Sequence, residues 1–384
     1  MGYFRNRNIN FLNLHSGLVA FSDSIITVFG VIYFITLGFS LPYIFLAWST
    51  THLFRLMLRP VVLKLVNLIG IKKVLMIGTA AYGGLYLIAA QIVNNHWLFL
   101  IFFACFAISD ILYWFPYHTY FAQLGEDHNR GKDVGSRESI NKILRAISPI
   151  VTGFLAQYVG FWLVYLVGAV VTLVAIVPLF YTPDMGRVEE MSFKQAREQV
   201  SFTGFRLWFS WAFLYYLHEF IWVIVLFFMV NKFVNFGGLV ALEVLFSLVV
   251  MLSLGALIDK GRGAKIISWA LVSLIIVIIG RTFFVKSIGM IILFQFLMAI
   301  AAALYGPLIL SIFYNECHRS KNSVWFTFFA EAGWDVGAMI CLLLLALWTA
   351  GGLDIRYIMP LALVGAIANL WYAKKHLRHK LFEI

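Results

Sequence analysis

Long apolar segments separated by short polar turns repeat along the chain from one end to the other. At a rise of about 1.5 Å per helical residue, each is long enough to cross a hydrocarbon core of about 30 Å. The pattern predicts an all-helical integral membrane protein with twelve transmembrane spans. The predicted spans are residues 11–36, 39–60, 73–93, 97–121, 138–160, 161–182, 205–230, 236–258, 266–286, 288–314, 323–349 and 355–373.

The longest polar stretch, residues 182–204, falls at the middle of the chain. It predicts a six-helix half over residues 1–182, a linker over 183–204 and a second six-helix half over 205–384. Within the linker, residues 190–200 are expected to form a short amphipathic helix on the membrane surface.

Basic residues gather at the amino terminus, in every second loop and in the tail. Of the 29 Lys and Arg residues, we place only Lys232, Arg281, Lys286 and Arg356 on or near the opposite face. By the positive-inside rule, both termini are cytoplasmic in a multi-pass protein of the cell (inner or cytoplasmic) membrane. The net charge of +11 then reflects cytoplasmic loops against the lipid bilayer and calls for no nucleic acid partner.

The composition excludes a soluble globular domain, because 62% of the residues are hydrophobic and only 12% are charged. The three cysteines have no metal-site spacing and require no disulfide. No phosphate-binding loop, metal motif or nucleophile elbow occurs. We therefore expect neither an enzyme nor a bound cofactor or metal.

One predicted span carries a carboxylate where the bilayer is least polar. Asp110 lies near the middle of residues 98–121, and Tyr113, Trp114 and Tyr117 follow it at helical spacing on the same face. An isolated charge at the bilayer centre costs roughly 2.5–3.5 kcal/mol even on the lenient insertion scale. We therefore expect this helix face to be paired or wet.

Acids from three other spans lie at nearly the same predicted depth. Asp23, Asp110, Glu219 and Asp335 are each about 12 to 14 residues into their spans, near the midplane. We expect them to exchange protons and contact substrate. Each could instead be neutral and hydrogen-bonded to a neighbouring helix.

Neighbouring side chains extend this candidate site. Glu331 and Asp335 are a like-charge pair one helical turn apart, so we expect one of them to hold a proton. His218 lies beside Glu219 and is a further candidate for proton coupling. The remaining predicted pocket residues are Tyr215, Trp222 and Trp334, and weaker candidates are His15, His118 and Glu243.

The turn after the eighth span carries a recognisable motif. It reads Gly255-Ala-Leu-Ile-Asp259-Lys260-Gly261-Arg262 and resembles the loop signature of the major facilitator superfamily. The matching turn of the first half keeps Gly70 but has Asn67 where the family usually has aspartate. The resemblance implies a cytoplasmic gate formed by Gly255, Asp259, Lys260 and Arg262, although a solvated turn explains these residues as well.

The same resemblance implies a mechanism. In the family, two six-helix halves rock about a midplane site lined by spans one, four, seven, ten and eleven, which would place the acids around one cavity. Residues 148–153, Ser-Pro-Ile-Val-Thr-Gly, are similar to a glycine-proline motif of facilitator antiporters and slightly favour efflux over uptake.

The chemistry of the predicted cavity suggests a class of substrate. We find no Lys or Arg near the midplane, because Arg145 and Arg281 lie toward span ends. An anion site would be expected to offer a guanidinium, so anionic substrates are disfavoured. Acids among tyrosine and tryptophan suit a small cationic or neutral amphipathic molecule. We expect a monomeric secondary transporter coupled to protons or, as a second choice, to Na⁺.

Two other classes of function stay open on the same scaffold. One is a lipid or lysolipid translocator, which would need a lateral hydrophobic opening. The other is a sensor or scaffold that has lost transport, and Asn67 in the first-half turn is its main support.

Overall fold

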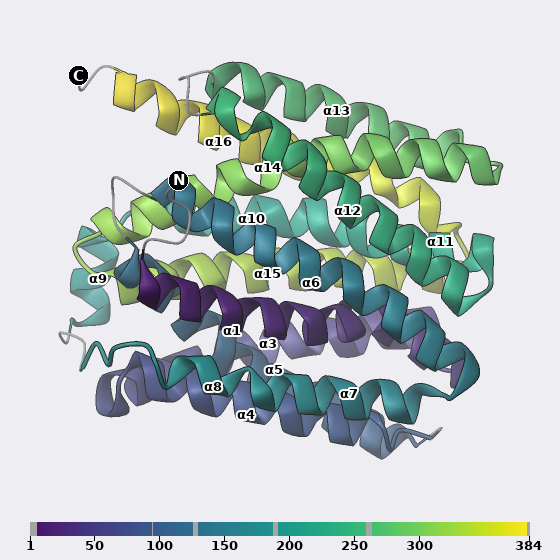
Figure 1. The fold of residues 1–384 in the computed structure, drawn as a ribbon, viewed down its shortest axis with the longest axis horizontal. Helices are drawn as coiled ribbons and strands as arrows, with labels where there is room; N and C mark the ends of the chain where they lie inside the picture. Colours follow the sequence, from purple (N-terminus) through teal and green to yellow (C-terminus); the bar gives the residue numbers. More distant parts are fainter. Residues whose placement is uncertain (1–5, 94, 126–129, 187–190, 259–262, 382–384) are drawn as a thin grey trace.

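The computed structural model describes residues 6–93, 95–125, 130–186, 191–258 and 263–381, and this part of the chain is helical with short connections (Figure 1). The helices are α1 (Arg7–Ser24), η1 (Ile25–Gly30), α2 (Val31–Thr36), α3 (Leu41–Ile69), α4 (Ile71–Ala89), α5 (His96–Leu124), α6 (Arg130–Tyr158), α7 (Phe161–Val174), α8 (Ile176–Leu179), α9 (Phe193–Gln199), α10 (Thr203–Leu214), η3 (Tyr215–Phe220), α11 (Ile221–Val230), α12 (Phe233–Ile258), α13 (Gly263–Phe283), α14 (Ile288–Arg319), α15 (Ser323–Ala350), η4 (Ile355–Leu361) and α16 (Ala362–Leu381).

Ten helical stretches among the described residues are long and apolar enough to cross a membrane. The helices α3 and α6 are not among them, although each has 29 residues, and both carry several charged side chains. The count of twelve spans therefore stays a prediction. The ten stretches are Arg7–Thr36, Ile71–Ala89, His96–Leu124, Phe161–Leu179, Thr203–Val230, Phe233–Ser253, Ile266–Phe283, Ile288–Arg319, Ser323–Ala350 and Ile355–Lys375.

The second predicted span ends too early in the sequence-based assignment. Arg59 and Pro60 were expected to close it, but α3 continues to Ile69 with Pro60 inside the helix. Proline is tolerated in membrane helices because neighbouring groups satisfy the freed backbone carbonyl. The extension moves Arg55 from near the end of a span to the middle of a long helix.

The helices group by their order in the chain. In Figure 1, α1 to α8 lie mainly in the lower part of the view and α10 to α16 mainly in the upper part. Between the groups, α6 packs along α12 and α3 packs along α15. The start of α1, the short helix α9 and the end of α16 all lie at the left end of the view.

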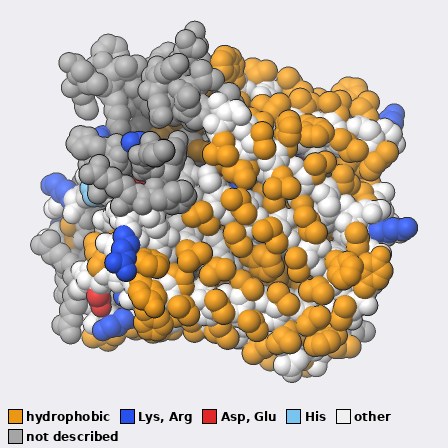
Figure 2. Space-filling view, in the orientation of Figure 1, with side chains coloured by type: hydrophobic (Ala, Val, Ile, Leu, Met, Phe, Trp, Pro, Cys, Tyr) orange, Lys and Arg blue, Asp and Glu red, His pale blue; other side chains and the backbone are white. Residues whose placement is uncertain are grey.

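The surface of the bundle fits a lipid environment. Figure 2 shows hydrophobic side chains over the middle of the visible face, with Lys and Arg gathered toward its two ends. The helix α9 lies within the predicted amphipathic segment and begins with a capping box between Ser192 and Gln195.

Two of the long helices contain π-helical turns. In the first span, η1 continues α1 without a break, and in the seventh, η3 joins α10 to α11. A π-helical turn has a wider hydrogen-bonding pattern than the α-helix and is found frequently at functional sites. It also rotates the residues that follow, so side chains on either side of η3 do not keep the face expected from a period of 3.6.

Small residues let α6 and α12 approach closely. A Cβ atom on Gly153 would lie 2.5 Å from the carbonyl oxygen of Phe233, and one on Gly237 would collide with the carbonyl oxygen of Pro149. The segment 148–153 thus has a packing role at this contact between the two groups of helices.

We predict that Gly237→Ala lowers the free energy of unfolding by about 1–3 kcal/mol, because the added methyl forces the α6 and α12 backbones apart. Gly238→Ala is the matched control, since a Cβ there has no neighbour within 4 Å. Thermal unfolding in detergent micelles measures both variants. Equal stabilities would contradict the close approach.

Candidate functional site

The centre of the molecule is organised by one buried guanidinium. Arg55, in the middle of α3, has only 3% of its side chain exposed. Its Nη1 atom lies 2.7 Å from Oδ2 of Asp110 on α5 and 3.1 Å from Oδ1 of Asp335 on α15. Its Nη2 atom donates to Oε2 of Glu331 at 2.9 Å. One arginine therefore joins three carboxylates from two other helices.

Asp335 has further positively charged and polar partners. Arg59, one turn after Arg55, pairs with its carboxylate and donates from Nη1 to the Phe328 carbonyl at 3.0 Å. Nδ1 of His52, one turn before Arg55, lies 2.9 Å from Oδ1 of Asp335. Asp335 thus contacts two guanidiniums and an imidazole, and it is the most fully compensated acid of the group.

The other two acids have weaker support. Glu331 accepts a hydrogen bond from Nε1 of Trp208 at 3.2 Å, and its Oε1 atom lies 3.7 Å from Nε2 of His118. Asp110 accepts a hydrogen bond from the Tyr82 hydroxyl of α4. Among the described residues, Arg55 is the only guanidinium that pairs with Glu331 or with Asp110, and it also pairs with Asp335.

We call Arg55, Arg59, Asp110, Glu331 and Asp335 the Arg55 network. It contains two guanidiniums and three carboxylates, all buried. With every carboxylate ionised, the network carries one excess negative charge, and a single proton neutralises it. Because unpaired charge in a low dielectric is costly, protonation of one carboxylate would relieve this excess charge.

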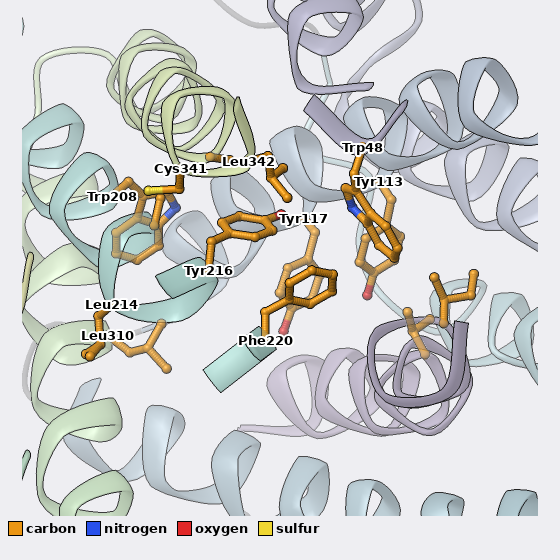
Figure 3. Close-up of a cluster of buried hydrophobic side chains, with 14 of the residues drawn as sticks. Trp48, Tyr113, Tyr117, Trp208, Leu214, Tyr216, Phe220, Leu310, Cys341 and Leu342 are labelled. Atoms are coloured by element: carbon orange, nitrogen blue, oxygen red, sulfur yellow. The ribbon is translucent and has the colours of Figure 1, made fainter. Parts of the chain in front are cut away.

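An aromatic cluster surrounds the network. Figure 3 shows Trp208, Tyr216 and Tyr117 within the same buried group as Trp48 and Phe220. The Tyr216 hydroxyl lies 2.7 Å from Nε2 of the network's neighbour His52. The cluster excludes water, which strengthens the electrostatic contacts that it encloses.

The expectation that no guanidinium lies near these acids is wrong. Arg55 and Arg59 fall in the last turns of the predicted span 39–60 and were grouped with the basic residues of the cytoplasmic side. The overlooked signal was a stripe on one helix face, His52, Arg55 and Arg59, spaced like the acidic and aromatic stripe after Asp110.

Two of the predicted acids lie outside the Arg55 network. Asp23, at the end of α1, pairs with Arg145 of α6 across 3.2 Å. Glu219, in η3, makes no ion pair or hydrogen bond with any described residue and lines a separate cavity of about 150 Å³. The structure thus brings Asp110, Glu331 and Asp335 together and leaves Asp23 and Glu219 apart from them.

The cavity beside Glu219 has charged and aromatic walls. Glu243 of α12 pairs with Arg281 of α13 at 2.6 Å, and the Arg281 guanidinium lies 4.3 Å from the ring centroid of Trp222. Trp222 Nε1 donates to the side-chain oxygen of Gln295 at 2.8 Å. Arg145 and Tyr215 also line the cavity.

The predicted aromatic residues lie in different surroundings. Tyr113 stacks on Tyr117 with ring centroids 5.6 Å apart, and the Tyr117 hydroxyl accepts a hydrogen bond from Arg137 at 2.7 Å. Trp114 stacks on the His118 ring at 5.4 Å. Trp334 lies against Tyr215 and Tyr216, at 5.6 and 5.8 Å.

The remaining candidates are not part of either group. His218 is fully buried, neither of its ring nitrogens has a hydrogen-bond partner among the described residues, and it does not line the cavity. Nδ1 of His15 lies 2.7 Å from the Ala175 carbonyl oxygen. Of the predicted gate, Gly255 belongs to α12, whereas Asp259, Lys260 and Arg262 lie outside the described residues.

Comparison with known proteins identifies the fold. A family model described as Major Facilitator Superfamily matches residues 14–241, more than half of the 384-residue chain. No curated protein sequence matches significantly. Membership of this family points to a transporter and not an enzyme.

Two solved structures are similar over nearly the whole chain. The crystal structure of the human organic anion transporter MFSD10 (TETRAN) has a TM-score of 0.69 at 14% identity, covering 96% of this chain and 100% of that chain. The crystal structure of an auto-inhibited POT family peptide transporter has a TM-score of 0.71 at 10% identity, covering 96% and 97%. At these identities the likeness shows the fold alone.

We predict that Arg55→Ala destabilises the protein by about 3–5 kcal/mol, because it leaves buried carboxylates without their shared partner. Arg356→Ala is the matched control, since Arg356 pairs with Asp354 at the surface and should contribute about 1 kcal/mol or less. Thermal unfolding in detergent micelles gives both values.

A charge-balanced double variant sharpens this test. Arg55→Gln with Glu331→Gln removes one charge of each sign, so it should recover part of the stability lost in Arg55→Gln alone. The Arg55 network would be refuted as an electrostatic unit by equal losses in the single and double variants.

Proposed function

Because the chain belongs to the major facilitator superfamily, we propose that it is a proton-coupled secondary transporter that works by alternating access. The observation that carries this proposal is the Arg55 network, with its single excess negative charge. We further propose that α3 and α6 also span the membrane, giving twelve spans in two halves, residues 1–182 and 205–384. The protein would lie in the cell membrane with cytoplasmic termini and act as a monomer.

The Arg55 network joins helices of the two proposed halves. Arg55 and Asp110 belong to α3 and α5 of the first half, whereas Glu331 and Asp335 belong to α15 of the second. Any movement of one half against the other at this level must separate Arg55 from the α15 carboxylates. Separating a buried ion pair is costly unless one charge is removed first.

Glu331 is the acid best suited to take the coupling proton. Asp335 is compensated by Arg55, Arg59 and His52, and protonating it would leave Arg59 without a carboxylate partner among the described residues. Glu331 has Arg55 as its only guanidinium partner among the described residues. Protonated Glu331 would also lower the repulsion between Glu331 and Asp335, which are one helical turn apart on α15.

The substrate that we propose is a small cationic or neutral amphipathic molecule. The guanidiniums of the Arg55 network do not change this proposal, because both already contact carboxylates. With all three carboxylates ionised, the net charge of the network is negative. Charge attraction and aromatic contact favour a cation in such surroundings. Efflux is slightly favoured by the Ser148–Gly153 segment, although its packing against α12 explains that segment as well.

We predict that the Glu331→Gln variant keeps its fold but loses the acceleration of transport by an imposed pH gradient, because glutamine cannot exchange a proton. The substrate is first identified by thermal shift, screening organic cations, neutral solutes, organic anions and lysolipids. A ligand at about 100 times its Kd adds roughly 2.7 kcal/mol to the native state, which is readily detected. Flux is then measured in liposomes with and without the gradient.

The exposed acid Glu198 of α9 supplies the control, since Glu198→Gln makes the same chemical change far from any buried charge. It should respond to the gradient like the wild type. An equal response in Glu331→Gln would exclude Glu331 as the proton carrier. Stabilisation by lysolipids alone, without transport, would favour the lipid translocator or non-transporting alternative.

A further inference from the structure

The cavity beside Glu219 lies at the junction of two irregular helices. Ser24 and Thr27 line it from the end of α1 and from η1, and Tyr215 and Glu219 line it from η3. The π-helical turns η1 and η3 therefore border the same cavity. Such turns are rare, and they occur frequently at functional sites.

The charges around this cavity leave one carboxylate available. Arg145 pairs with Asp23 at 3.2 Å, and Arg281 pairs with Glu243 at 2.6 Å. Glu219 is the remaining acid that lines the cavity, and it has no ion pair or hydrogen bond among the described residues. A ligand that entered the cavity would meet an unpaired carboxylate and two guanidiniums that are already engaged.

One more basic group lies nearby on α6. Lys142, one turn before Arg145, donates from Nζ to the Ser247 hydroxyl of α12 at 2.8 Å and does not line the cavity. It therefore points its charge to the contact between α6 and α12. The cavity wall itself keeps the carboxylate of Glu219 as its unpaired charge.

The aromatic residues of the cavity favour a cation. Tyr215, Phe220 and Trp222 form part of the wall. The ring of Trp222 already holds a cation on its face, since the Arg281 guanidinium is 4.3 Å from its centroid. Aromatic faces beside a carboxylate are the usual surroundings for bound ammonium groups.

The volume of the cavity limits the size of the ligand. At about 150 Å³ it matches cavities that hold a molecule as small as benzene. Pockets for drug-sized ligands have about 300–1,000 Å³. The volume of the cavity in this conformation therefore fits a compact ion better than a large amphiphile.

We propose that this cavity binds a small organic monocation, a compact primary or quaternary ammonium ion, with Glu219 as its ion-pairing partner. The proposal rests on the transport function proposed above for its biological role and narrows the substrate class. It also separates substrate from proton, because the acids of the Arg55 network do not line the cavity.

The two sites still share one structural element. In η3, Tyr215 lines the cavity, whereas the hydroxyl of the next residue, Tyr216, lies 2.7 Å from Nε2 of His52, which contacts Asp335. A ligand that shifts η3 therefore acts on the surroundings of the Arg55 network without touching its carboxylates.

Calorimetric titration of the purified full-length protein with tetraalkylammonium chlorides tests the proposal, against sodium chloride at equal ionic strength. Tetramethylammonium should bind, and affinity should fall through tetraethylammonium to tetrabutylammonium. Glu219→Gln should weaken tetramethylammonium binding about tenfold or more, a loss of about 1.4 kcal/mol. Glu219→Asp, which keeps the charge, should retain part of the affinity, and Glu198→Gln should match the wild type.

Several results would overturn the assignment. Absence of tetramethylammonium binding to the wild type would do so, as would tightest binding by tetrabutylammonium, which indicates non-specific association with apolar surface. Unchanged affinity in Glu219→Gln would remove the proposed ion pair. Tighter binding of trimethylglycine than of tetramethylammonium would assign a zwitterion site in which Arg145 takes part.

Transport measured separately in liposomes distinguishes this inference from the proposed function. Specific ammonium binding without any flux under a pH gradient would overturn the transport function and leave the binding site standing. Proton-driven flux of an ammonium ion that Glu219→Gln does not change would overturn the binding site and leave the transport function standing.

Discussion

A guanidinium buried in a membrane protein must be matched by acids that are buried with it, and this constraint determines how the centre of the molecule is built. Arg55 is surrounded by Asp110, Glu331 and Asp335, and removing Arg55 would leave these buried carboxylates without their shared partner. The positions of α3, α5 and α15 are therefore tied together by charge as well as by packing. The aromatic residues around them keep water away and raise the cost of separating the charges.

Under the proposed function, the same constraint lets the molecule respond to protons. A network with one carboxylate in excess is stable only if a proton, a ligand or water takes up the difference, and it lies between helices of the two proposed halves. The cavity at Glu219 is the proposed second site, and η3 contributes Tyr215 to the cavity and Tyr216 to the surroundings of the network. Ligand in the cavity and proton in the network would then influence each other through the position of one π-helical turn, which fits alternating access with separate sites for driving ion and cargo.

Much of this architecture follows from sequence pattern, and the parts that do not follow have physical reasons. Apolar runs and the loop motif at Gly255 are local signals, and they identified the membrane helices and the family. The position of Asp110 and Asp335 in the middle of spans was also visible. Arg55 was overlooked because it lies near the end of the predicted span 39–60, whereas α3 continues past Pro60 to Ile69, since a proline inside a membrane helix is tolerated.

Other errors of the sequence-based reading have a geometric origin. Depth along a span gives only one coordinate of a side chain, and the other is its direction around the helix axis. Equal depth suggested one site for Asp23, Asp110, Glu219 and Asp335. Their different directions place Asp23 and Glu219 apart from the Arg55 network. The π-helical turn η3 changes that direction within a single turn, and no residue pattern in 215–220 announces it. His218 shares the predicted face with Glu219 and yet does not line the cavity.

The most direct test of the central claim is whether protonation of the Arg55 network separates α3 from α15. Spin labels at Leu68→Cys and Lys321→Cys, two exposed positions near the ends of these helices, would report the separation by pulsed electron resonance in nanodiscs, with the three native cysteines replaced. We predict that acidification shifts the distance distribution toward longer separations, and that Glu331→Gln shows the longer separations at every pH. Identical distributions for the wild type at acid and neutral pH, and for Glu331→Gln, would contradict the account.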